Sequence, residues 1–306
     1  MWPEEVPPSK KMRLEELPST PVSERVTILM VTSPILSHPS TELMERVVSS
    51  FSLVSSLSSC NMLLLADGAK CGKFRPKRGM VPTDMVTNYS MYLDKLEELV
   101  ENAETDSIWS RTKVIRMSEH LGFGHVVLHG LKLATTEYVM VLQHDHPFSI
   151  KFSISPVMEF MDSNKANYVS LPISTVWRHV NRCSSMHQID LRAKAVTFGR
   201  GRFIPILFWY DGTHVARRET YIKLVFEGEQ ALPLGHFIED TFSQWVMGLL
   251  REDYEKWFPV FSMYMFQPEQ EKEEALIFHL DGRNYRTDKE RRELGWGDNP
   301  GGAGVT

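Results

Sequence analysis

Residues 124–148 read GHVVLHGLKLATTEYVMVLQHDHPF, and they contain the change of pattern that decides the fold. The first part carries apolar side chains at helical spacing, which predicts a helix over residues 124–134. Residues 137–143 are a run of strand-forming residues, which predicts a buried β-strand. The run ends abruptly in Gln143, followed by two histidines around Asp145 and a proline. A helix that leads into a buried strand favours an α/β fold with a largely parallel sheet.

The same alternation of strands and amphipathic helices continues outward from this stretch. Towards the N-terminus, we expect strands at residues 26–31, 62–66 and 113–117, a helix from residue 43 and another over residues 86–103. The second half is more mixed, with one long helix at 241–255 and strands, some antiparallel, at 168–171, 195–198, 204–210, 260–265 and 275–280. The cluster after Gln143 therefore lies at the carboxyl end of a strand, where open α/β sheets bind their ligands.

Length and composition predict one domain with two tails. A chain of 306 residues with 42% hydrophobic and 24% charged residues is long enough for one large α/β unit. We expect a single domain at residues 25–290, divided into a first half, 25–150, and a second half, 151–290. The Pro-, Glu-, Lys- and Ser-rich residues 1–24 and the glycine-rich residues 291–306 are expected to be flexible tails.

Charge and cysteine content limit the possible partners. A formal charge of −5 gives no general attraction to nucleic acid or to an anionic membrane, so we expect no nucleic acid partner and only local recognition of phosphate. Three cysteines without Cys-x-x-Cys spacing cannot all pair, which favours a reducing compartment. Residues 1–18 lack the apolar core of a signal peptide, and the apolar run at 203–210 is far too short to span a membrane. These features together predict a soluble, cytoplasmic protein without a transmembrane segment.

The cluster His144-Asp145-His146 allows two interpretations when it is taken alone. Imidazole and carboxylate groups together suit Mn²⁺, Zn²⁺ or Fe²⁺, because imidazole is a softer ligand than oxygen. The same residues are also typical of a polar turn that closes before Pro147, which fixes the backbone. Both interpretations stay open on these residues alone.

The residues that lead into the cluster carry a resemblance to a known family. The sequence GLKLATTEYVMVLQHD at residues 130–145 resembles the segment Gly-Leu-x-x-Ala-x-x-x-Tyr-Ile-x-Phe-Leu-Asp-x-Asp of GT-A-type glycosyltransferases, especially family 2. In that family the final Asp-x-Asp holds a divalent metal against the diphosphate of a nucleotide sugar. The resemblance maps Asp145 onto the last carboxylate, whereas Gln143 replaces the first and carries no charge. It also implies a GT-A-type, Rossmann-like fold with helices on both sides of the sheet.

Residues elsewhere in the first half follow the order that this family requires. Thr32-Ser33 and Asp67 follow two expected strands and resemble its nucleotide-binding strand ends. The resemblance thus implies a nucleotide-sugar site made of Thr32, Ser33, Asp67, Gln143, His144 and Asp145. An ordinary strand-to-loop turn at Asp67-Gly68 remains the alternative for that position.

The second half resembles the acceptor-binding half of the family over residues 210–250. In that pattern the Asp of a Glu-Asp pair removes the proton from the acceptor hydroxyl, which implies that Asp240 is the catalytic base with Glu239 beside it. The alternative is a structural role, because Thr241 to Gln244 form a capping box at the start of the expected long helix.

Two histidines complete the implied metal site. Many GT-A enzymes use a histidine that follows the Glu-Asp helix as a further metal ligand, and His279 stands in that place. His146 is the second candidate beside Asp145. Nitrogen ligands of this kind favour Mn²⁺ over Mg²⁺. A lone histidine in an apolar strand is otherwise a structural residue.

These features predict a metal-dependent glycosyltransferase that moves a single sugar from a nucleotide diphosphate sugar to a hydroxyl on a glycan, lipid-linked or protein-linked acceptor. A single base fits direct displacement, which inverts the sugar's configuration. The Gln-x-x-Arg-Trp motif of processive synthases is absent from the sequence. The alternatives are a metal-dependent hydrolase and a non-catalytic module that binds nucleotide sugars or glycans.

Overall fold

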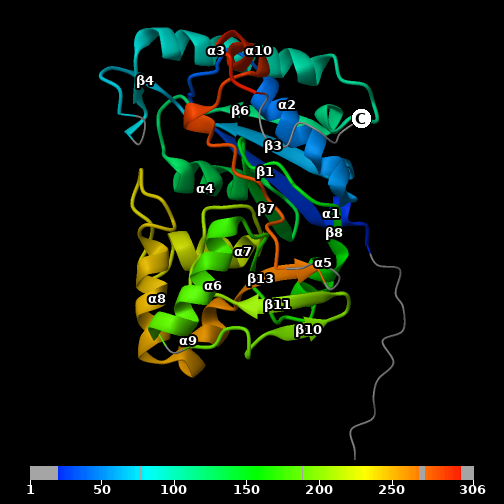
Figure 1. Cartoon of the computed structure of the whole chain (residues 1–306), viewed down its shortest axis with the longest axis vertical. Helices are drawn as coiled ribbons and strands as arrows, with labels where there is room; N and C mark the ends of the chain where they lie inside the picture. The colour runs from blue at the N-terminus through cyan, green and yellow to red at the C-terminus, as the bar shows by residue number, and fades with distance from the viewer. Residues whose placement is uncertain (1–19, 76–77, 188, 269–272, 298–306) are drawn as a thin grey trace, which may run out of the picture.

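One nine-stranded sheet, in the order β10-β11-β13-β9-β12-β7-β1-β3-β6, runs through both halves of the chain (Figure 1). The strands of the first half are parallel to one another, and they are β1 (Val26–Thr32), β3 (Asn61–Ala66), β6 (Thr112–Arg116) and β7 (Tyr138–Gln143). The other strands form a mixed half, and they are β9 (Tyr168–Ser170), β10 (Val196–Phe198), β11 (Gly201–Pro205), β12 (His214–Arg217) and β13 (Met263–Pro268). The expected α/β fold, mostly parallel at first and mixed afterwards, is confirmed.

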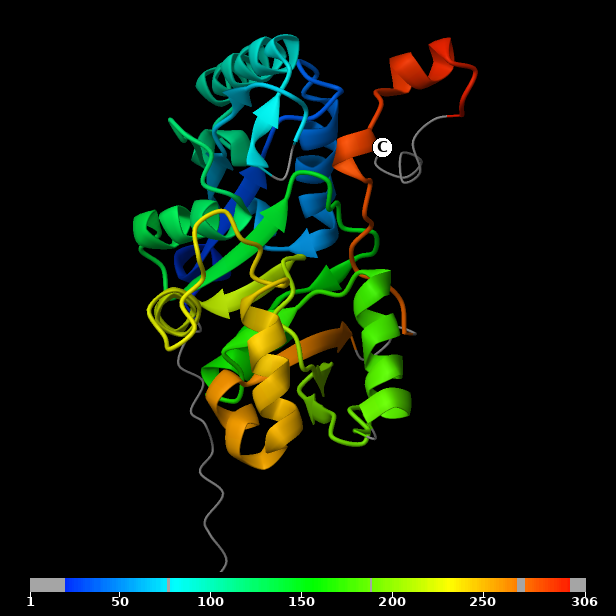
Figure 2. The ribbon, with the colours of Figure 1, turned by 90° about the vertical axis from the view of Figure 1, so that its left-hand side faces the viewer.

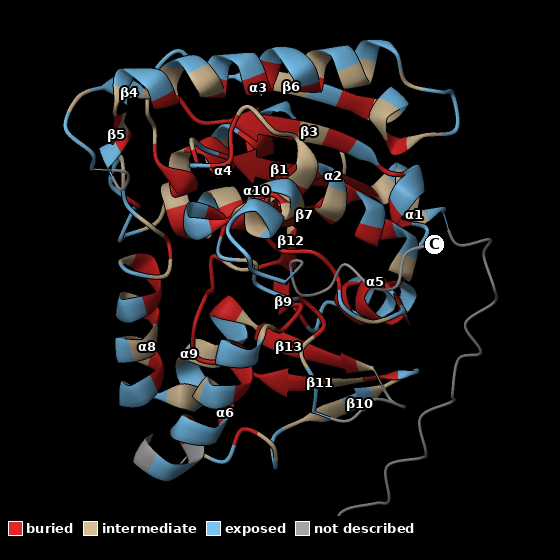
Figure 3. Cartoon of the chain, turned by 45° about the horizontal axis from the view of Figure 1, so that its top comes forward, coloured by how far each residue is buried: buried red, intermediate tan, exposed pale blue. Residues whose placement is uncertain are grey.

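Helices cover both faces of this sheet, and the strands between them are buried, apart from most of the outer strands β6 and β10 (Figure 3). One core contains α2 (Glu42–Ser49), α3 (Thr83–Glu101) and α5 (Ser155–Asp162). The other contains α4 (Phe123–Leu133), α6 (Ser174–His187), α7 (Arg218–Tyr221), α8 (Phe242–Glu252) and α9 (Tyr254–Phe261). Alternate residues of β1 serve the two cores, with Ile28 in the first and Leu29 in the second, as the two-residue period of a strand requires.

The structure is a computed structural model that describes residues 20–75, 78–187, 189–268 and 273–297. Most of the two expected tails, residues 1–19 and 298–306, lies outside the described residues. Among the described helices, none is long and apolar enough to cross a membrane. The remaining short elements are α1 (Val22–Arg25), η1 (Ser50–Leu53), β2 (Val54–Ser55), η2 (Leu57–Ser59), β4 (Lys70–Cys71), β5 (Met80–Val81), η4 (Ile108–Arg111), β8 (Phe152–Ser153), η5 (Ile222–Phe226), η6 (Gly282–Asn284) and α10 (Asp288–Glu293).

Three strands expected in the second half differ from the structure. The strand expected at 204–210 ends at Pro205, and the following apolar residues are buried as an irregular segment. The strand expected from residue 260 begins at Met263, because α9 occupies the chain as far as Phe261. The segment expected as a strand at 275–280 makes only an isolated bridge, between Ile277 and Phe148.

Residues 275–288 form a C-terminal strap that crosses the domain on its outside and leads into α10 (Figure 2). Backbone hydrogen bonds join the strap to the chain after β7: Ser149 N–H to Leu276 O (2.9 Å), Phe278 N–H to Pro147 O (2.9 Å) and Leu280 N–H to Asp145 O (3.0 Å). Its far end is fixed to α2, where the Tyr285 hydroxyl donates to Glu42 (2.7 Å) and Arg46 pairs with Asp288 (2.8 Å). The strap therefore brings distant sequence to the carboxyl end of β7.

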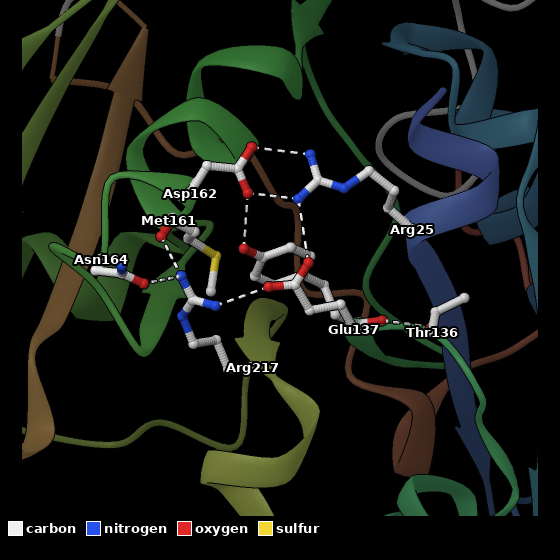
Figure 4. Close-up of polar contacts among 8 residues, drawn as sticks. Arg25, Thr136, Glu137, Met161, Asp162, Asn164 and Arg217 are labelled. Carbon is white, nitrogen blue, oxygen red and sulfur yellow. Dashed lines mark hydrogen bonds and ion pairs between the residues drawn. The ribbon is translucent and has the colours of Figure 1, made fainter. Parts of the chain in front are cut away.

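A polar network joins the two halves at the opposite edge of the sheet (Figure 4). Arg25, just before β1, holds both carboxylate oxygens of Asp162 at the end of α5. Arg217 of β12 donates to Glu137 (2.8 Å), which also accepts from Arg25 (3.3 Å). Tyr138 lies between the two guanidinium groups, each 5.2 Å from its ring centroid, and donates its hydroxyl to Asp162 (2.8 Å).

Candidate functional site

The carboxyl ends of β1, β3 and β7 meet at one pocket. In the sheet register Thr32 lies opposite Ala66, and Val31 lies opposite Gln143, so the residues that follow these strands are neighbours. Gly235 and Phe237 line the pocket from the loop before α8, and Arg283 lines it from η6. All six residues expected to contact a nucleotide sugar line this one pocket, namely Thr32, Ser33, Asp67, Gln143, His144 and Asp145.

The side chains of Thr32 and His144 contact each other in the pocket. The Thr32 hydroxyl lies 2.6 Å from His144 Nδ1 and 3.2 Å from the Tyr92 hydroxyl, and all three side chains are buried. Burial also lowers the pKa of His144, which favours the neutral imidazole. Ser33, by contrast, is exposed on the pocket wall. The pair thus ties the end of β1 to the residue after β7.

Asp67 holds the loop that follows β6. One carboxylate oxygen accepts the N–H groups of Gly68 (2.9 Å) and Leu121 (2.8 Å), and the other accepts that of Gly122 (3.2 Å). The same second oxygen lies 2.7 Å from His120 Nδ1. Since a carboxylate offers about four acceptor positions, these four contacts use the hydrogen-bonding capacity of Asp67. Asp67 therefore fixes the loop that forms the pocket wall, whereas an ordinary strand-to-loop turn would not need these contacts. Its contact with a nucleoside stays a prediction.

Gln143 connects the pocket to a buried acidic residue that sequence reasoning missed. Its side-chain Nε2 donates to the backbone oxygen of Asp211 (3.0 Å). Asp211 follows the buried segment 206–210 and precedes Gly212, as Asp67 precedes Gly68 after β3. That repeated strand-end pattern is the sequence signal that could have identified it.

Asp211 and Glu239 are joined by reciprocal hydrogen bonds between backbone and side chain. The N–H of Asp211 donates to Glu239 Oε2 (3.5 Å), and the N–H of Glu239 donates to Asp211 Oδ1 (3.4 Å). Burial raises the pKa of both carboxyl groups, and the neighbouring Glu239 raises the pKa of Asp211 further. Asp240 is exposed. The expected capping box does not form, because the Thr241 side chain makes no cap hydrogen bond and lies 3.1 Å from His236 Nδ1.

The three residues expected to bind a metal lie together. Ligand atoms of Asp145, His146 and His279 all lie within 4.8 Å of one another. Nε2 of His279 is 3.3 Å from Asp145 Oδ2, and Nε2 of His146 is 3.8 Å from Asp145 Oδ1. Oδ1 is buried and has no hydrogen-bond partner in the part of the chain that the structure describes. An unpartnered buried carboxylate oxygen beside two imidazoles fits a divalent cation.

The charge states of these three side chains also favour binding of a divalent cation. Burial lowers the pKa of His146 to about 4, so its ring is neutral and keeps a lone pair for a ligand. Burial opposes ionisation of Asp145, but hydrogen bonds from His279 and Gly282 and the nearby histidines lower its pKa on balance. The hydrogen bond to Asp145 in turn raises the pKa of His279, whose side chain is 53% exposed.

Gly282 and Arg283 are further site residues that sequence reasoning missed. The Gly282 N–H donates to Asp145 Oδ2 (2.8 Å). A Cβ atom at position 282 would lie 3.0 Å from that oxygen and 2.9 Å from His144 Nε2, so the close approach requires glycine. The next side chain, Arg283, lines the pocket and its charge opposes protonation of His279. The Asp-Gly dipeptide at 281–282 was the available turn signal.

One protein family matches a part of the chain that contributes to this site. The family described as glycosyl transferase family 2 matches residues 90–223, which include β7 and the residues from Gln143 to His146. The resemblance expected from the sequence is therefore confirmed over this segment. Among curated proteins, none matches the chain.

Several solved structures are similar to parts of the chain. The mannosyltransferase PcManGT from Pyrobaculum calidifontis, in complex with GDP-Man and Mn²⁺, has a TM-score of 0.41 and 12% identity over 65% of this chain and 46% of that chain. S. aureus TarS 1–349 in complex with UDP has a TM-score of 0.45 and 10% identity, over 88% and 63% of the two chains. The same protein with UDP-GlcNAc has a TM-score of 0.44 and 12% identity, over 88% and 64%. The chain spans less than two thirds of the length of each of these proteins.

Proposed function

We propose that this chain, whose residues 90–223 match glycosyl transferase family 2, is a metal-dependent glycosyltransferase that uses a nucleotide diphosphate sugar. The observation that carries the proposal is the position of the six strand-end residues, which line one pocket directly beside the group Asp145, His146 and His279. A pocket at the carboxyl ends of parallel strands is also where an α/β sheet binds a nucleotide.

Asp145, His146 and His279 would hold the metal. When bound, a divalent cation supplies positive charge that stabilises the diphosphate leaving group. Two imidazole ligands favour Mn²⁺ over Mg²⁺, which prefers oxygen ligands and retains its waters. The Gly282 N–H and the strap's backbone hold Asp145 and His279 in position.

The rest of the pocket would bind the donor. Asp67 holds the loop at 120–122 that forms one wall, and Ser33 leaves its hydroxyl exposed on another. Gln143 cannot supply the negative charge of the acid that it replaces, and its side-chain amide donates a hydrogen bond to the Asp211 backbone oxygen. Arg283 presents a guanidinium group to the pocket, and such a group matches the oxygens of a diphosphate.

The acceptor would approach from the side of Glu239 and Asp240, which provide the base. Removal of the hydroxyl proton by one carboxylate fits a single displacement at the anomeric carbon, so we infer inversion of configuration. The missing Gln-x-x-Arg-Trp motif supports transfer of one sugar at a time. A hydroxyl on a glycan, a lipid-linked sugar or a protein would serve as acceptor.

Thermal-shift measurements with a panel of nucleotide sugars, each with and without Mn²⁺, test this function. We expect one nucleotide sugar to raise the melting temperature only when Mn²⁺ is present, because a ligand at 100 times its Kd stabilises the native state by about 2.7 kcal/mol. Asp145→Asn should abolish the metal-dependent part. The matched control Asp106→Asn, at an exposed position, should retain it.

Two outcomes would contradict the proposal. Release of free sugar at the same rate with and without an acceptor would indicate a metal-dependent hydrolase. Binding of a nucleotide sugar without transfer to any hydroxyl acceptor in a broad panel would indicate a binding module.

A further inference from the structure

The carboxyl groups of Asp211 and Glu239 belong to neighbouring residues, and a single hydrogen bond from Gln143 connects Asp211 to the pocket. Each accepts the backbone N–H of the other residue, at 3.4 and 3.5 Å, and the Gln143 amide of the pocket wall donates to the Asp211 backbone oxygen. Asp211 is only 7% exposed, and Glu239 is half-buried. Within the described residues, neither carboxyl group has a Lys, Arg or His within ion-pair distance.

This arrangement cannot hold two negative charges at low cost. Two negative charges held close together repel each other, and they do so more strongly at the effective dielectric constant of a protein than in water. Burial adds a desolvation cost to each ionised group, and no cation offsets either cost. One proton therefore stays on the pair at neutral pH, and it stays on the more deeply buried group.

We propose that Asp211 is a neutral carboxylic acid at neutral pH, and that Glu239 beside it, rather than the exposed Asp240, is the base that takes the acceptor's proton. The first statement concerns the folded protein alone, and the second rests on the proposed glycosyltransferase function. The direction of the pKa shift agrees with a protonated Asp211, because burial and then the charge of Glu239 raise the pKa of its carboxyl group.

The proposed step balances in atoms and charge. The acceptor oxygen forms a bond to the anomeric carbon while the bond from that carbon to the diphosphate oxygen breaks, and its electron pair leaves with the nucleoside diphosphate. The hydroxyl proton moves to a Glu239 carboxylate oxygen and is later released to water. Asp211 keeps its own proton throughout and acts as a positioning residue, because it holds the Glu239 backbone and adds no second negative charge.

Other titratable groups surround the pair, and none of them brings a positive charge. Asp240 lies beside it in the chain and raises the pKa of both carboxyl groups. The phenols of Tyr168, Tyr210 and Tyr221 also face the pair, and burial raises the pKa of each, so they stay neutral over the range of interest. The proton on Asp211 therefore has no competing cation among these groups.

The pH dependence of stability tests the neutral acid directly, without any ligand. Between the unfolded pKa of Asp, about 3.9, and the raised folded pKa of Asp211, the native protein binds one proton that the unfolded chain has released. Each pH unit in that range then lowers the wild-type folding equilibrium constant by about tenfold through this group. Asp211→Asn imitates the neutral acid, so it should lack this loss and become the more stable protein as pH rises from 4 to 8.

Urea unfolding of both proteins across that range measures the effect. Asp106→Asn, at an exposed position, should instead follow the wild-type curve at every pH. Parallel curves for the wild type and Asp211→Asn would overturn the neutral acid. So would a large loss of stability in Asp211→Asn at pH 8, since that would mean that the native site needs the negative charge.

Steady-state kinetics test the assignment of the base. Glu239→Gln should lower kcat at least hundredfold with little change in KM, because general base catalysis contributes about 10²- to 10⁴-fold. Asp211→Asn should change the alkaline limb of the pH profile of kcat, since the second ionisation of the pair is gone. A larger kcat loss in Asp240→Asn than in Glu239→Gln would overturn the assignment. A wild type that transfers no sugar would refute the proposed function, while the unfolding experiment would still decide the charge of Asp211.

Discussion

Arg283 is a positively charged side chain on the pocket wall, and within the described residues it forms no hydrogen bond or ion pair through its guanidinium group. Its charge is therefore available to a ligand. We predict that Arg283→Gln weakens binding of a nucleoside diphosphate by at least tenfold, because hydrogen bonds to charged groups contribute about 1.5–3 kcal/mol. Binding of the nucleoside alone should not change. Isothermal titration calorimetry with the diphosphate and the nucleoside measures both.

A control and a conservative variant sharpen this prediction. Lys289→Gln removes one positive charge from a side chain that is 82% exposed on α10, so it should leave both affinities unchanged. Arg283→Lys keeps the charge but loses the fork of donors, and an intermediate affinity is expected. Equal weakening of nucleoside and diphosphate binding by Arg283→Gln would mean that the residue shapes the pocket and does not pair with phosphate.

The donor-side residues are predictable from the sequence because each follows a strand. Strand ends of a parallel sheet meet at one edge, so the strand pattern alone places Ser33, Asp67 and Asp145 close together, as the pocket confirms. The position of Asp211 could not be derived in this way, because the chain leaves the sheet at Pro205 and reaches Asp211 through the irregular segment 206–210. Nor could that of Arg283, because its position depends on where the strap crosses β7, and no local periodicity encodes a crossing between distant segments.

Long buried strands could be predicted from the sequence, whereas a very short strand could not. The strands β1, β3 and β7 are covered on both faces, so they appear as continuous apolar runs with helices between them. β12, with the sequence HVAR, has only four residues and was missed, although it forms the antiparallel link between β7 and β9. A strand that short carries too little pattern to be separated from a loop.

The C-terminal strap carries His279, one of the three proposed metal ligands, and holds it beside the other two, Asp145 and His146. Tyr285 is 2% exposed and packs with Ile35 and Leu43, while its hydroxyl binds Glu42. We predict that Tyr285→Ala detaches the strap and lowers Mn²⁺ affinity at least tenfold, because His279 depends on the strap for its place. Loss of a buried aromatic side chain costs about 3–5 kcal/mol where it packs. Calorimetry with Mn²⁺, and hydrogen exchange of the strap amides, measure the two effects.

The strap offers its own control for this variant. Phe278 is 40% exposed, so Phe278→Ala removes an aromatic ring from the same strap without opening its anchor. It should keep both the Mn²⁺ affinity and the slow exchange of the strap amides. If the strap amides of Tyr285→Ala exchange as slowly as those of the wild type, the backbone bonds to residues 145–149 and the Arg46–Asp288 ion pair hold the strap without Tyr285.

At the scale of the whole molecule, the network of Figure 4 joins the parallel half to the mixed half, at the edge of the sheet opposite the pocket. The hydrogen bond from Arg25 lowers the pKa of Asp162, so the stabilisation is complete above the unfolded pKa of about 3.9 and is lost as pH falls through the lower folded pKa. We predict that Asp162→Asn lowers the free energy of unfolding by about 1 kcal/mol at pH 7, a value reduced for screening because the carboxylate is 39% exposed.

The pH dependence separates this network from the buried pair at Asp211, because the two signs are opposite. The difference between the wild type and Asp162→Asn should stay constant from pH 7 to about 4 and shrink as pH falls further, whereas the difference made by Asp211→Asn should grow as pH rises. High salt should reduce the effect at Asp162, since that pair is partly exposed. Urea unfolding at several pH values and at two salt concentrations measures both. A constant difference at Asp162 across pH would mean that the residue joins the halves through packing and neutral hydrogen bonds such as that from Tyr138, and not through its charge.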